Sequence, residues 1–443
     1  MARSRRRKPL PENLITTIES MSHDGRGVVH VDGKAVFVDG ALPGEKVELQ
    51  YTLIKRKFDE AKVVNVISAA VDRVEPKCAH FELCGGCSLQ HLSPDAQVEY
   101  KQTSLLDALK HVGNTTPLEV LPALKADSWG YRRKARLGVK YVHKKEKVLV
   151  GFREKRNSFL ADIEKCHVLH PEVGEHLLDL AELIGSLTVF DAIAQIEVAA
   201  MQNVTALVFR NLRELTAEDI EKLVAFEKEF NFQIYLQSGG PDTVAAISDD
   251  TRRLSYQHPD YDVDVTIEPL DFFQINFPIN QLMVEQAVAA LELNAGDSVL
   301  ELFCGLGNFT LPIASKSGKV TGVEVSERMV ERARHSSQQN AVENTEYFVD
   351  DLFKPNQKAT WFTREYDRLL LDPPRSGARE ILELLGPRKI PRIVYVSCNP
   401  GTLARDADLL VNQFGYQLDK AGVMDMFPHT THVESMAVFT LNS

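Results

Sequence analysis

The feature of this sequence that most constrains its fold is a short apolar run that passes directly into a glycine turn. Residues 298–303 are Ser-Val-Leu-Glu-Leu-Phe, and Cys304-Gly-Leu-Gly-Asn leads from them into a helical segment. Glycines at positions 305 and 307 let the backbone turn tightly and approach a ligand where a side chain would block it. After Pro269, strands, glycine turns and helices keep alternating, which predicts a doubly wound sheet of mainly parallel strands.

A second strand-like run, residues 319–324, ends on Glu324, nineteen residues after Gly305. A carboxylate at this place can accept both ribose hydroxyls of an adenosine. The glycine pair alone is shared with NAD enzymes and with ordinary strand–helix turns. The spacing of Glu301 from the glycine pair, with Asn308 in place of a third glycine, favours S-adenosylmethionine as the ligand.

Further acids follow the ends of later strand-like runs. Residues 346–349 lead to Asp350 and Asp351, and residues 368–371 lead to Asp372. Open α/β sheets bind ligands at the carboxyl edge of their strands, so these side chains are ligand candidates. Asp351 is placed to reach the amino group of an adenine.

Cys398 follows the fifth strand-like run, residues 392–397, and a proline at position 400 stops that strand before a helix. Most lone cysteines are buried packing residues. A thiol at a strand end and before a helix N-terminus is instead placed to be held as a thiolate. Cys304 is the rival nucleophile, although its place inside the glycine turn needs only a small side chain.

A thiolate at this edge has a defined use in pyrimidine chemistry. When it adds to C6 of a uracil, it pushes electron density into an enolate and makes C5 nucleophilic. After C5 has been methylated, a base must remove the C5 proton so that the thiolate can leave. His429, His432 and Glu434 are the candidate bases near the C-terminus, and their spacing does not choose among them.

Three motifs resemble, in this order, those of the RNA uracil-C5 methyltransferase family of class I enzymes: Asp372-Pro-Pro-Arg375, Ser397-Cys-Asn-Pro400 and His432-Val-Glu434-Ser-Met. The run Leu270-Asp-Phe-Phe-Gln274-Ile-Asn is similar to a further family motif. The resemblance implies that Cys398 is the nucleophile and Glu434 the base. It also implies that S-adenosylmethionine is bound by Gln274, Phe303, Asn308, Glu324, Asp351 and Asp372. Asp351 departs from the family's asparagine, but a carboxylate can still accept the adenine amine.

Four further cysteines have the spacing of a metal site: Cys78, Cys84, Cys87 and Cys166. Three of them lie within ten residues, and the Gly85-Gly86 pair would let this loop fold around an inorganic core. The spacing does not separate zinc, which His80, His91 or His167 could complete, from iron–sulfur, and cysteines without a metal are a further reading. The resemblance implies a [4Fe-4S] cluster on the four cysteines, as in the branch of the family that acts on large-subunit rRNA.

Residues 12–70 alternate short apolar runs with turns, which predicts five strands in a small β-barrel. The run Ser22-His-Asp-Gly-Arg-Gly-Val28 resembles the opening of a TRAM domain, an OB-like barrel of RNA-modifying enzymes. We therefore expect an RNA-binding barrel in residues 1–75, a central α+β domain with the cluster in 76–270, and a class I methyltransferase domain in 271–443.

The net charge of −11 speaks against an RNA partner, but the charge is segregated along the chain. Residues 3–8 hold five basic side chains and no acid, and residues 132–156 hold eleven basic residues against two acids. The simplest interpretation of these basic segments is that they are solvated loops that bind no ligand. We expect residues 132–136 and 140–147 to grip phosphates, and Phe272 or Phe273 to stack on a displaced base unless they pack in the core.

The composition, with 44% hydrophobic and 26% charged residues, is that of a soluble globular protein. The chain has neither a long apolar run nor a signal sequence, so we expect a cytoplasmic protein without a membrane partner. We also expect a monomer with no obligatory protein partner.

The resemblance, which covers nearly the whole chain, implies an rRNA-processing enzyme that methylates C5 of a uracil in 23S rRNA, with uracil 1939 as the expected target. Another rRNA or tRNA site, and a non-catalytic iron–sulfur RNA-binding protein, are the alternatives. Methylation of cytosine C5 or of an adenine amine is disfavoured because Arg375 follows the Pro-Pro pair.

Overall fold

The computed structural model describes residues 10–442, and its contacts divide the chain into two compact units. The first unit comprises Met1–Phe81, Gly86–Tyr100 and Pro428–Thr431, and the second comprises Glu82–Gly85, Lys101–Phe427 and His432–Ser443. The basic residues at positions 3–8, which we expected to help hold RNA, lie outside the described part. Within residues 10–442, no helix has the length and apolar character needed to cross a bilayer.

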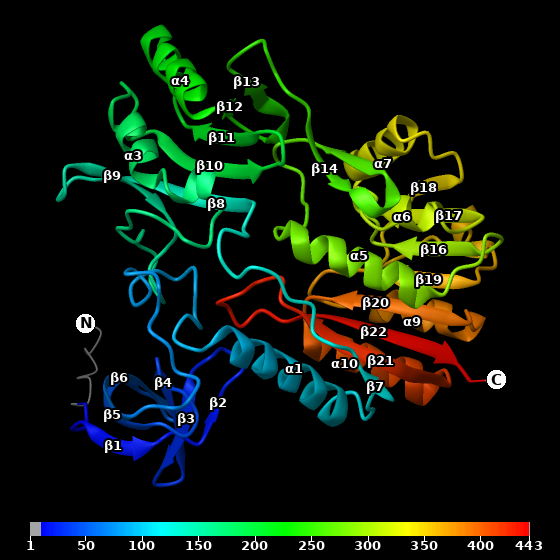
Figure 1. The fold of residues 1–443 in the computed structure, drawn as a ribbon, viewed down its shortest axis with the longest axis horizontal. Helices are drawn as coiled ribbons and strands as arrows, with labels where there is room; N and C mark the ends of the chain where they lie inside the picture. Colours follow the sequence, from blue (N-terminus) through cyan, green and yellow to red (C-terminus); the bar gives the residue numbers. More distant parts are fainter. Residues whose placement is uncertain (1–9, 443) are drawn as a thin grey trace, which may run out of the picture. The chain divides into compact units, whose positions relative to one another are not determined.

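The first unit contains one six-stranded sheet in the order β1-β5-β6-β4-β3-β2 (Figure 1, blue). Its strands are β1 (Leu14–Thr17), β2 (Ser20–Met21), β3 (Gly27–Val31), β4 (Lys34–Asp39), β5 (Lys46–Ile54) and β6 (Phe58–Ser68). Alternate side chains of four of these strands form one buried cluster that includes Val29, Val36, Val47 and Ala61. The prediction of five strands missed the two-residue strand β2, which pairs with β3 and is too short to leave a pattern.

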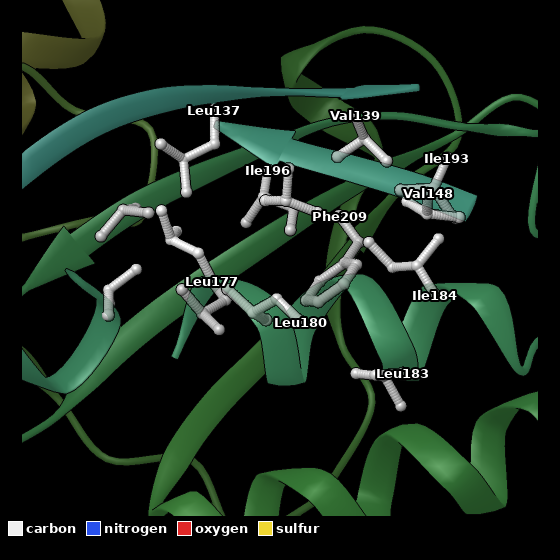
Figure 2. Close-up of a cluster of buried hydrophobic side chains, with 14 of the residues drawn as sticks. Leu137, Val139, Val148, Leu177, Leu180, Leu183, Ile184, Ile193, Ile196 and Phe209 are labelled. Atoms are coloured by element: carbon white, nitrogen blue, oxygen red, sulfur yellow. The ribbon is translucent and has the colours of Figure 1, made fainter. Parts of the chain in front are cut away.

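The second unit contains a six-stranded sheet in the order β13-β12-β11-β10-β8-β9. Its elements are β8 (Lys134–Val142), β9 (Lys147–Gly151), α2 (Pro171–Gly174), α3 (Leu177–Gly185), β10 (Ile193–Ala200), β11 (Thr205–Asn211), α4 (Ala217–Phe230), β12 (Phe232–Gln237), η1 (Pro241–Thr243) and β13 (Val244–Ala246). Apolar side chains of α3, such as Leu180 and Ile184, face Leu137, Ile196 and Phe209 of the sheet in one buried cluster (Figure 2). Apolar side chains recur at helical spacing near 174–186 and 217–229, and these stretches form α3 and α4.

A two-stranded sheet, β14 (Leu254–His258) with β15 (Val263–Ile267), precedes the last region of the second unit, with η2 (Pro259–Tyr261) between its strands. The last region is built on an eight-stranded sheet in the order β18-β17-β16-β19-β20-β22-β21-β7 (Figure 1, green to red for all but β7). The first five of these strands are parallel, as the alternation of strands and glycine turns predicted.

The elements of this region are α5 (Phe277–Leu291), β16 (Ser298–Leu302), α6 (Thr310–Ala314), β17 (Lys319–Glu324), α7 (Glu327–Gln339), β18 (Thr345–Val349), α8 (Thr360–Thr363), β19 (Arg368–Leu371), α9 (Arg379–Leu385), η3 (Gly386–Arg388), β20 (Arg392–Ser397), α10 (Pro400–Asp408), η4 (Leu409–Gln413), β21 (Tyr416–Met424) and β22 (Glu434–Leu441). Helix α5 begins at a cap, because the Asn276 side chain accepts from the Ile279 backbone N–H at 3.5 Å. It packs against β19 and β20.

The far edge of the eight-stranded sheet is formed by a segment from much earlier in the chain. Strand β7 (Glu119–Val120), which follows helix α1 (Pro94–His111), runs parallel to β21. The backbone N–H of Leu121 donates to the Ala421 carbonyl at 2.9 Å, and that of Leu124 donates to Val423 at 3.1 Å. At Gly422 a Cβ atom would lie 2.6 Å from the Cβ of Leu121, so the close approach of the two backbones requires glycine there.

Candidate active site

The turn after β16 is built from left-handed backbone. Phe303, Gly305 and Gly307 have φ angles of 61°, 53° and 87°. Phe303 is a bulky residue in a conformation that costs free energy, and such strain is stored where a site needs it. The neighbouring Cys304 is buried, its sulfur would lie 3.0 Å from a Cβ at Gly322, and burial raises the pKa of its thiol. Cys304 therefore behaves as a packing residue, which removes it as a nucleophile.

Glu324 ends β17 and points its carboxylate at this turn. It accepts from the backbone N–H of Ser326 at 3.0 Å and of Gly305 at 3.4 Å. These bonds fix the carboxylate beside the glycine turn, where the ribose of an adenosine would lie in an open α/β sheet. The residues present therefore fit the nucleoside part of S-adenosylmethionine.

Two more acids at this edge hold their protons unusually well. Burial raises the pKa of Glu301 to about 8 and that of Asp372 to about 7. The backbone N–H of Asp372 donates to the Leu302 carbonyl at 3.4 Å, which places this acid at the end of β19 next to β16. A ligand with a positive charge, such as a sulfonium, would favour the ionised forms of these acids when it binds here.

Asn308 serves a network that the sequence did not reveal. Its side-chain oxygen accepts from the Tyr256 hydroxyl and from the Asn280 amide at 3.0 Å each, and the His258 ring lies at the same distance. Its own amide donates to Asn280 at 2.9 Å. These hydrogen bonds connect the glycine turn to α5 and to the hairpin β14–β15. The sequence around Asn280 and Tyr256 contains no motif that predicts this role.

The two remaining cofactor candidates lie in loops. Asp351 is exposed, and its carboxylate accepts from the Phe353 backbone N–H at 3.0 Å, while the Phe353 ring lies 6.0 Å from that of Phe303. Gln274 is half-buried between β15 and α5. Beside it, Phe273 is buried in the core against Tyr256, whereas Phe272 is 62% exposed, so only Phe272 remains a candidate for stacking on a base.

The strand register brings Cys398 and Glu434 together. Strands β20 and β22 are antiparallel, and the last pair of their register joins Ser397 to Ser435 (Figure 1). Cys398 directly follows Ser397 and Glu434 directly precedes Ser435, so the two residues lie together where this ladder ends, and Glu434 is close enough to raise the pKa of the Cys398 thiol. The other candidate bases have different places: His429 belongs to the first unit, where the backbone N–H of Ser88 donates to its carbonyl at 2.9 Å.

The His432 ring accepts a hydrogen bond and is disfavoured in its protonated form. The Arg375 guanidinium lies 2.7 Å from its Nδ1, and burial together with Arg375 lowers the pKa of the ring. Because the guanidinium can only donate, Nδ1 must be the unprotonated nitrogen. Glu434 is thus the candidate base that faces the thiol.

The protons of the thiol and of this carboxyl are coupled. Burial and the nearby carboxylates Glu434 and Asp372 raise the pKa of Cys398 to about 11, and Arg375 opposes them. Burial and Asp372 likewise raise the pKa of Glu434 to about 8. Both groups therefore carry their protons in the resting protein at pH 7, and a charged Glu434 would favour the neutral form of the Cys398 thiol.

The turn that carries Cys398 is rigid. The Ser397 hydroxyl accepts from the Asn399 backbone N–H at 3.1 Å, and the Asn399 side chain caps α10 by accepting from Gly401 at 3.0 Å. The Asn399 amide and the Thr402 hydroxyl both donate to the Arg375 carbonyl, at 3.1 and 3.3 Å. The Ser-Cys-Asn-Pro motif and the Asp-Pro-Pro-Arg motif are therefore joined directly by hydrogen bonds.

Comparison with known proteins agrees with this geometry. The family model described as tRNA (Uracil-5-)-methyltransferase matches residues 95–441, and the TRAM domain model matches residues 16–64. The chain belongs to the tRNA (uracil-5-)-methyltransferase family. The resemblance read from the motifs is thereby confirmed, as is the prediction of an N-terminal TRAM domain in a multidomain α/β chain.

Members of this family with near-identical length are similar over the whole chain. The chain is 51% identical to the Methylococcus capsulatus protein called 23S rRNA (uracil(1939)-C(5))-methyltransferase RlmD, with 98% of each chain covered. It is 50% identical to the Alkalilimnicola ehrlichii protein of the same name, with 99% of each covered. The crystal structure of Pyrococcus abyssi tRNA (uracil-54, C5)-methyltransferase in complex with S-adenosyl-L-homocysteine has a TM-score of 0.73 at 24% identity, covering 96% of this chain and 99% of that one. This likeness shows a shared fold.

In the basic segment 132–136 of this chain, some side chains make contacts inside the protein. The Arg133 guanidinium donates to the carbonyls of Ala200 and Met201 at 3.2 Å each. Lys134 donates to the Pro269 carbonyl at 2.6 Å, and burial lowers its pKa to about 8. Composition could not show that these side chains point inward; the side chain of Arg136 is 71% exposed, although it is paired with Glu197.

The four cysteines fall in both units. Cys78 and Cys87 belong to the first unit, and Cys84 and Cys166 belong to the second. Among residues 10–442, no three or more His, Cys, Asp or Glu side chains are arranged to hold a metal ion. Gly85 has a structural reason of its own, because its backbone N–H donates to the Arg153 carbonyl at 2.8 Å and a Cβ would lie 3.0 Å from that oxygen.

Proposed function

We propose that this protein methylates C5 of a uracil in 23S rRNA, with uracil 1939 as its target, S-adenosylmethionine as methyl donor, Cys398 as nucleophile and Glu434 as base. The observation that carries the proposal is the register that sets Cys398 opposite Glu434 at the edge where β16 and β17 present Phe303 and Glu324. Relatives about 50% identical over nearly the full chain, named as 23S rRNA (uracil(1939)-C(5))-methyltransferases, support the choice of RNA and nucleotide.

When bound, S-adenosylmethionine supplies an electrophilic methyl group. Glu324 would accept the ribose hydroxyls, Asp351 would accept the adenine amine, and the Phe303 ring would lie against the nucleoside. Asp372 and Gln274 would complete the contacts, and Asn308 would act by holding the glycine turn through Asn280 and Tyr256. The buried acids Glu301 and Asp372 support this assignment, since they favour a positively charged ligand.

Cys398 and Glu434 divide the chemistry between them. The Cys398 thiol loses its proton to solvent and the sulfur bonds to C6 of uracil, so that the π pair of the C5–C6 double bond moves into an enolate and makes C5 nucleophilic. Once C5 carries the methyl group, Glu434 takes the C5 proton, the C5–C6 double bond re-forms and the C6–S bond breaks. Arg375 favours both ionised forms, since it lowers the pKa of Cys398 and of Glu434.

A stacked uracil hides C6, so the base must be unpaired or displaced into the site. The exposed Phe272 is a candidate surface for stacking, and Arg136 and residues 140–147 are candidate phosphate contacts. The TRAM domain, which forms the sheet β1–β6, would hold RNA as an accessory module.

We also propose a [4Fe-4S] cluster on Cys78, Cys84, Cys87 and Cys166. Four thiolates without an oxygen ligand are the donor set that iron–sulfur clusters and zinc prefer. Measurement of iron, sulfide and zinc in anaerobically purified protein would decide between them, and zinc or no metal would contradict the cluster. We assign the cluster a structural role, so full activity of the iron-free protein would contradict that role.

We also propose that the chain forms three domains, with the bounds 1–75, 76–270 and 271–443. The protein would act as a monomer in the cytoplasm. Sedimentation of the full chain at several concentrations would test the monomer.

The target is tested directly on RNA. Mass-spectrometric mapping of 23S rRNA from cells lacking the protein should show unmethylated uracil 1939, and the purified protein should restore the methyl group. Because the matching family is described by tRNA and the Pyrococcus abyssi structure is named for uracil 54 of tRNA, a tRNA transcript is the second substrate to assay. Methylation of tRNA in place of 23S rRNA would overturn the proposed target while leaving the chemistry intact.

A further inference from the structure

A lysine and an aspartate that no step above uses are buried together near the proposed base. Lys101 of α1 is 0% exposed, and its Nζ lies 2.6 Å from the Asp425 carboxylate and 2.9 Å from the Phe427 carbonyl. Asp425 directly follows Met424, the last residue of β21, and Met424 is the register partner of Glu434 on β22. The ion pair is thus anchored at the strand end that faces the base.

We infer that Lys101, held by Asp425, is a positioning residue that sets the proton affinity of Glu434 and thereby the rate at which the methylated uracil is released from Cys398. The inference rests on the proposed function, because it needs Glu434 to accept the C5 proton. It adds a residue from α1, which precedes Cys398 by 297 positions and Glu434 by 333 positions in the sequence.

Burying this ion pair is costly if stability is its only purpose. Taking an ammonium and a carboxylate out of water costs several kcal/mol each, and well-packed apolar side chains of similar volume often stabilise a protein as well or better. The next buried positions along α1, Leu105 and Leu109, carry leucines. A charge at position 101 therefore calls for a use of the charge itself.

The charged and titratable groups around Glu434 come from four elements. Asp372 and Arg375 follow β19, Cys398 follows β20, Asp425 follows β21 and Lys101 lies on α1. Asp372 raises the pKa of Glu434, and Arg375 and Lys101 lower it. Arg375 is exposed and also bound to His432, so water screens it, whereas Lys101 acts from a buried place where charges interact more strongly.

The partners of Lys101 offset part of the cost of burying its charge. Burial lowers the pKa of Lys101, and the contacts with Asp425, together with the charge of Glu434, oppose that effect. Glu434 in turn has its raised pKa moderated by Arg375 and Lys101. Without the lysine, a larger fraction of Glu434 would stay protonated at pH 7 and could not accept the C5 proton.

The test follows release of the methylated base as a function of pH. Full-length protein, a 23S rRNA fragment and S-adenosylmethionine with a radioactive methyl group are mixed and quenched in SDS, and the labelled protein–RNA adduct and the free labelled RNA are measured. In Lys101→Met the adduct should form but decay about tenfold more slowly at pH 7, which corresponds to a pKa one unit higher for the base. Above pH 9 the decay rates of the variant and the wild type should converge.

Two further variants keep the result interpretable. Lys101→Arg retains the cation and should keep the wild-type pH profile, whereas Leu105→Ala weakens the packing of the same helix and should lower stability without moving the profile. If Lys101→Met does not fold because Asp425 is left unpaired, the double variant Lys101→Met with Asp425→Asn removes both charges and should show the same shift.

An unchanged pH profile in Lys101→Met or in the double variant overturns the inference, as does an equal shift in Lys101→Arg. Failure of the proposed function has a different signature. In that case the wild-type protein would form no labelled adduct or product with the RNA, or Cys398→Ala would still methylate it.

Discussion

The eight-stranded sheet has a parallel half and an antiparallel half, and each half brings different residues to the edge that carries the candidate site. In the parallel half, β16, β17 and β19 each end at the same edge, and the residues at or just after these ends, Phe303, Glu324 and Asp372, are those proposed to bind the cofactor. In the antiparallel half, β22 runs the other way, so its first residue, Glu434, reaches the edge where β20 ends before Cys398.

This difference shows how one edge can hold two reactants. A purely parallel sheet offers only strand ends and the turns that follow them, which suits a nucleotide. Adding one reversed strand puts a rigid backbone pair, rather than a loop, across from the nucleophile. The acid–base partner is therefore positioned by sheet hydrogen bonds, and the cofactor carboxylates are positioned by turns.

The largest expected effect comes from removing Cys398, the proposed nucleophile at the end of β20. Cys398→Ala should lower methyl transfer by on the order of 10⁴-fold or more, as loss of a covalent nucleophile does. Release of tritium from 5-tritiated uridine in the RNA measures this loss. Cys304→Ala, which removes the buried thiol of the cofactor turn, is the matched control and should still release tritium; equal loss in both variants would argue against Cys398.

Removing the base of the same pair should stop the reaction at a later stage. Glu434→Gln keeps the shape of the side chain but cannot accept a proton, so the methylated RNA should remain covalently bound and turnover should fall roughly 10²- to 10⁴-fold. The adduct is detected as a labelled band in denaturing gels. Normal turnover without an adduct would mean that another group removes the proton.

A substitution in the parallel half should affect binding more than chemistry. Glu324→Gln weakens the acceptor for the ribose hydroxyls, and we expect the Kd of S-adenosylmethionine to rise about 10-fold, equivalent to about 1.4 kcal/mol. Isothermal titration calorimetry measures this change. Glu331→Gln, on the exposed face of α7, is the control and should bind as the wild type does.

The smallest expected effect is a pH dependence of stability. Because the folded state raises the pKa of Glu434 to about 8 from an ordinary 4.5, the folded protein holds a proton that the unfolded chain has released. The free energy of unfolding therefore falls as pH rises through this window, by at most about 1.4 kcal/mol per pH unit. Thermal unfolding of wild type and Glu434→Gln isolates this contribution, since other shifted groups such as His258 and Lys134 are common to both; parallel curves would contradict it.

Much of the parallel half was predictable because its signals are local. The apolar runs at 298–303, 319–324 and 392–397 became β16, β17 and β20 with almost the same bounds, since fully buried parallel strands are continuous apolar runs. The resemblance to the family supplied Cys398 and Glu434, and those assignments remain predictions for the experiments above.

What was missed depends on contacts between distant parts of the chain. Lys101 and Asp425 are separated by 324 residues, and neither has a neighbour in the sequence that indicates a buried pair. The direction of Arg133 and Lys134 was equally hidden, because composition records a charge without recording where its side chain points. Asn280 joins Asn308 by hydrogen bonds that no motif encodes.

The edge strand β7 bears on how this molecule can be dissected in the laboratory. Residues 118–124 supply backbone partners to β21, so a fragment that starts at residue 271 would leave a row of amide and carbonyl groups without partners. Bare edges of this kind recruit other chains and aggregate. A recombinant catalytic fragment will therefore stay monodisperse only if the peptide around Leu121 is kept, by fusion or by co-expression.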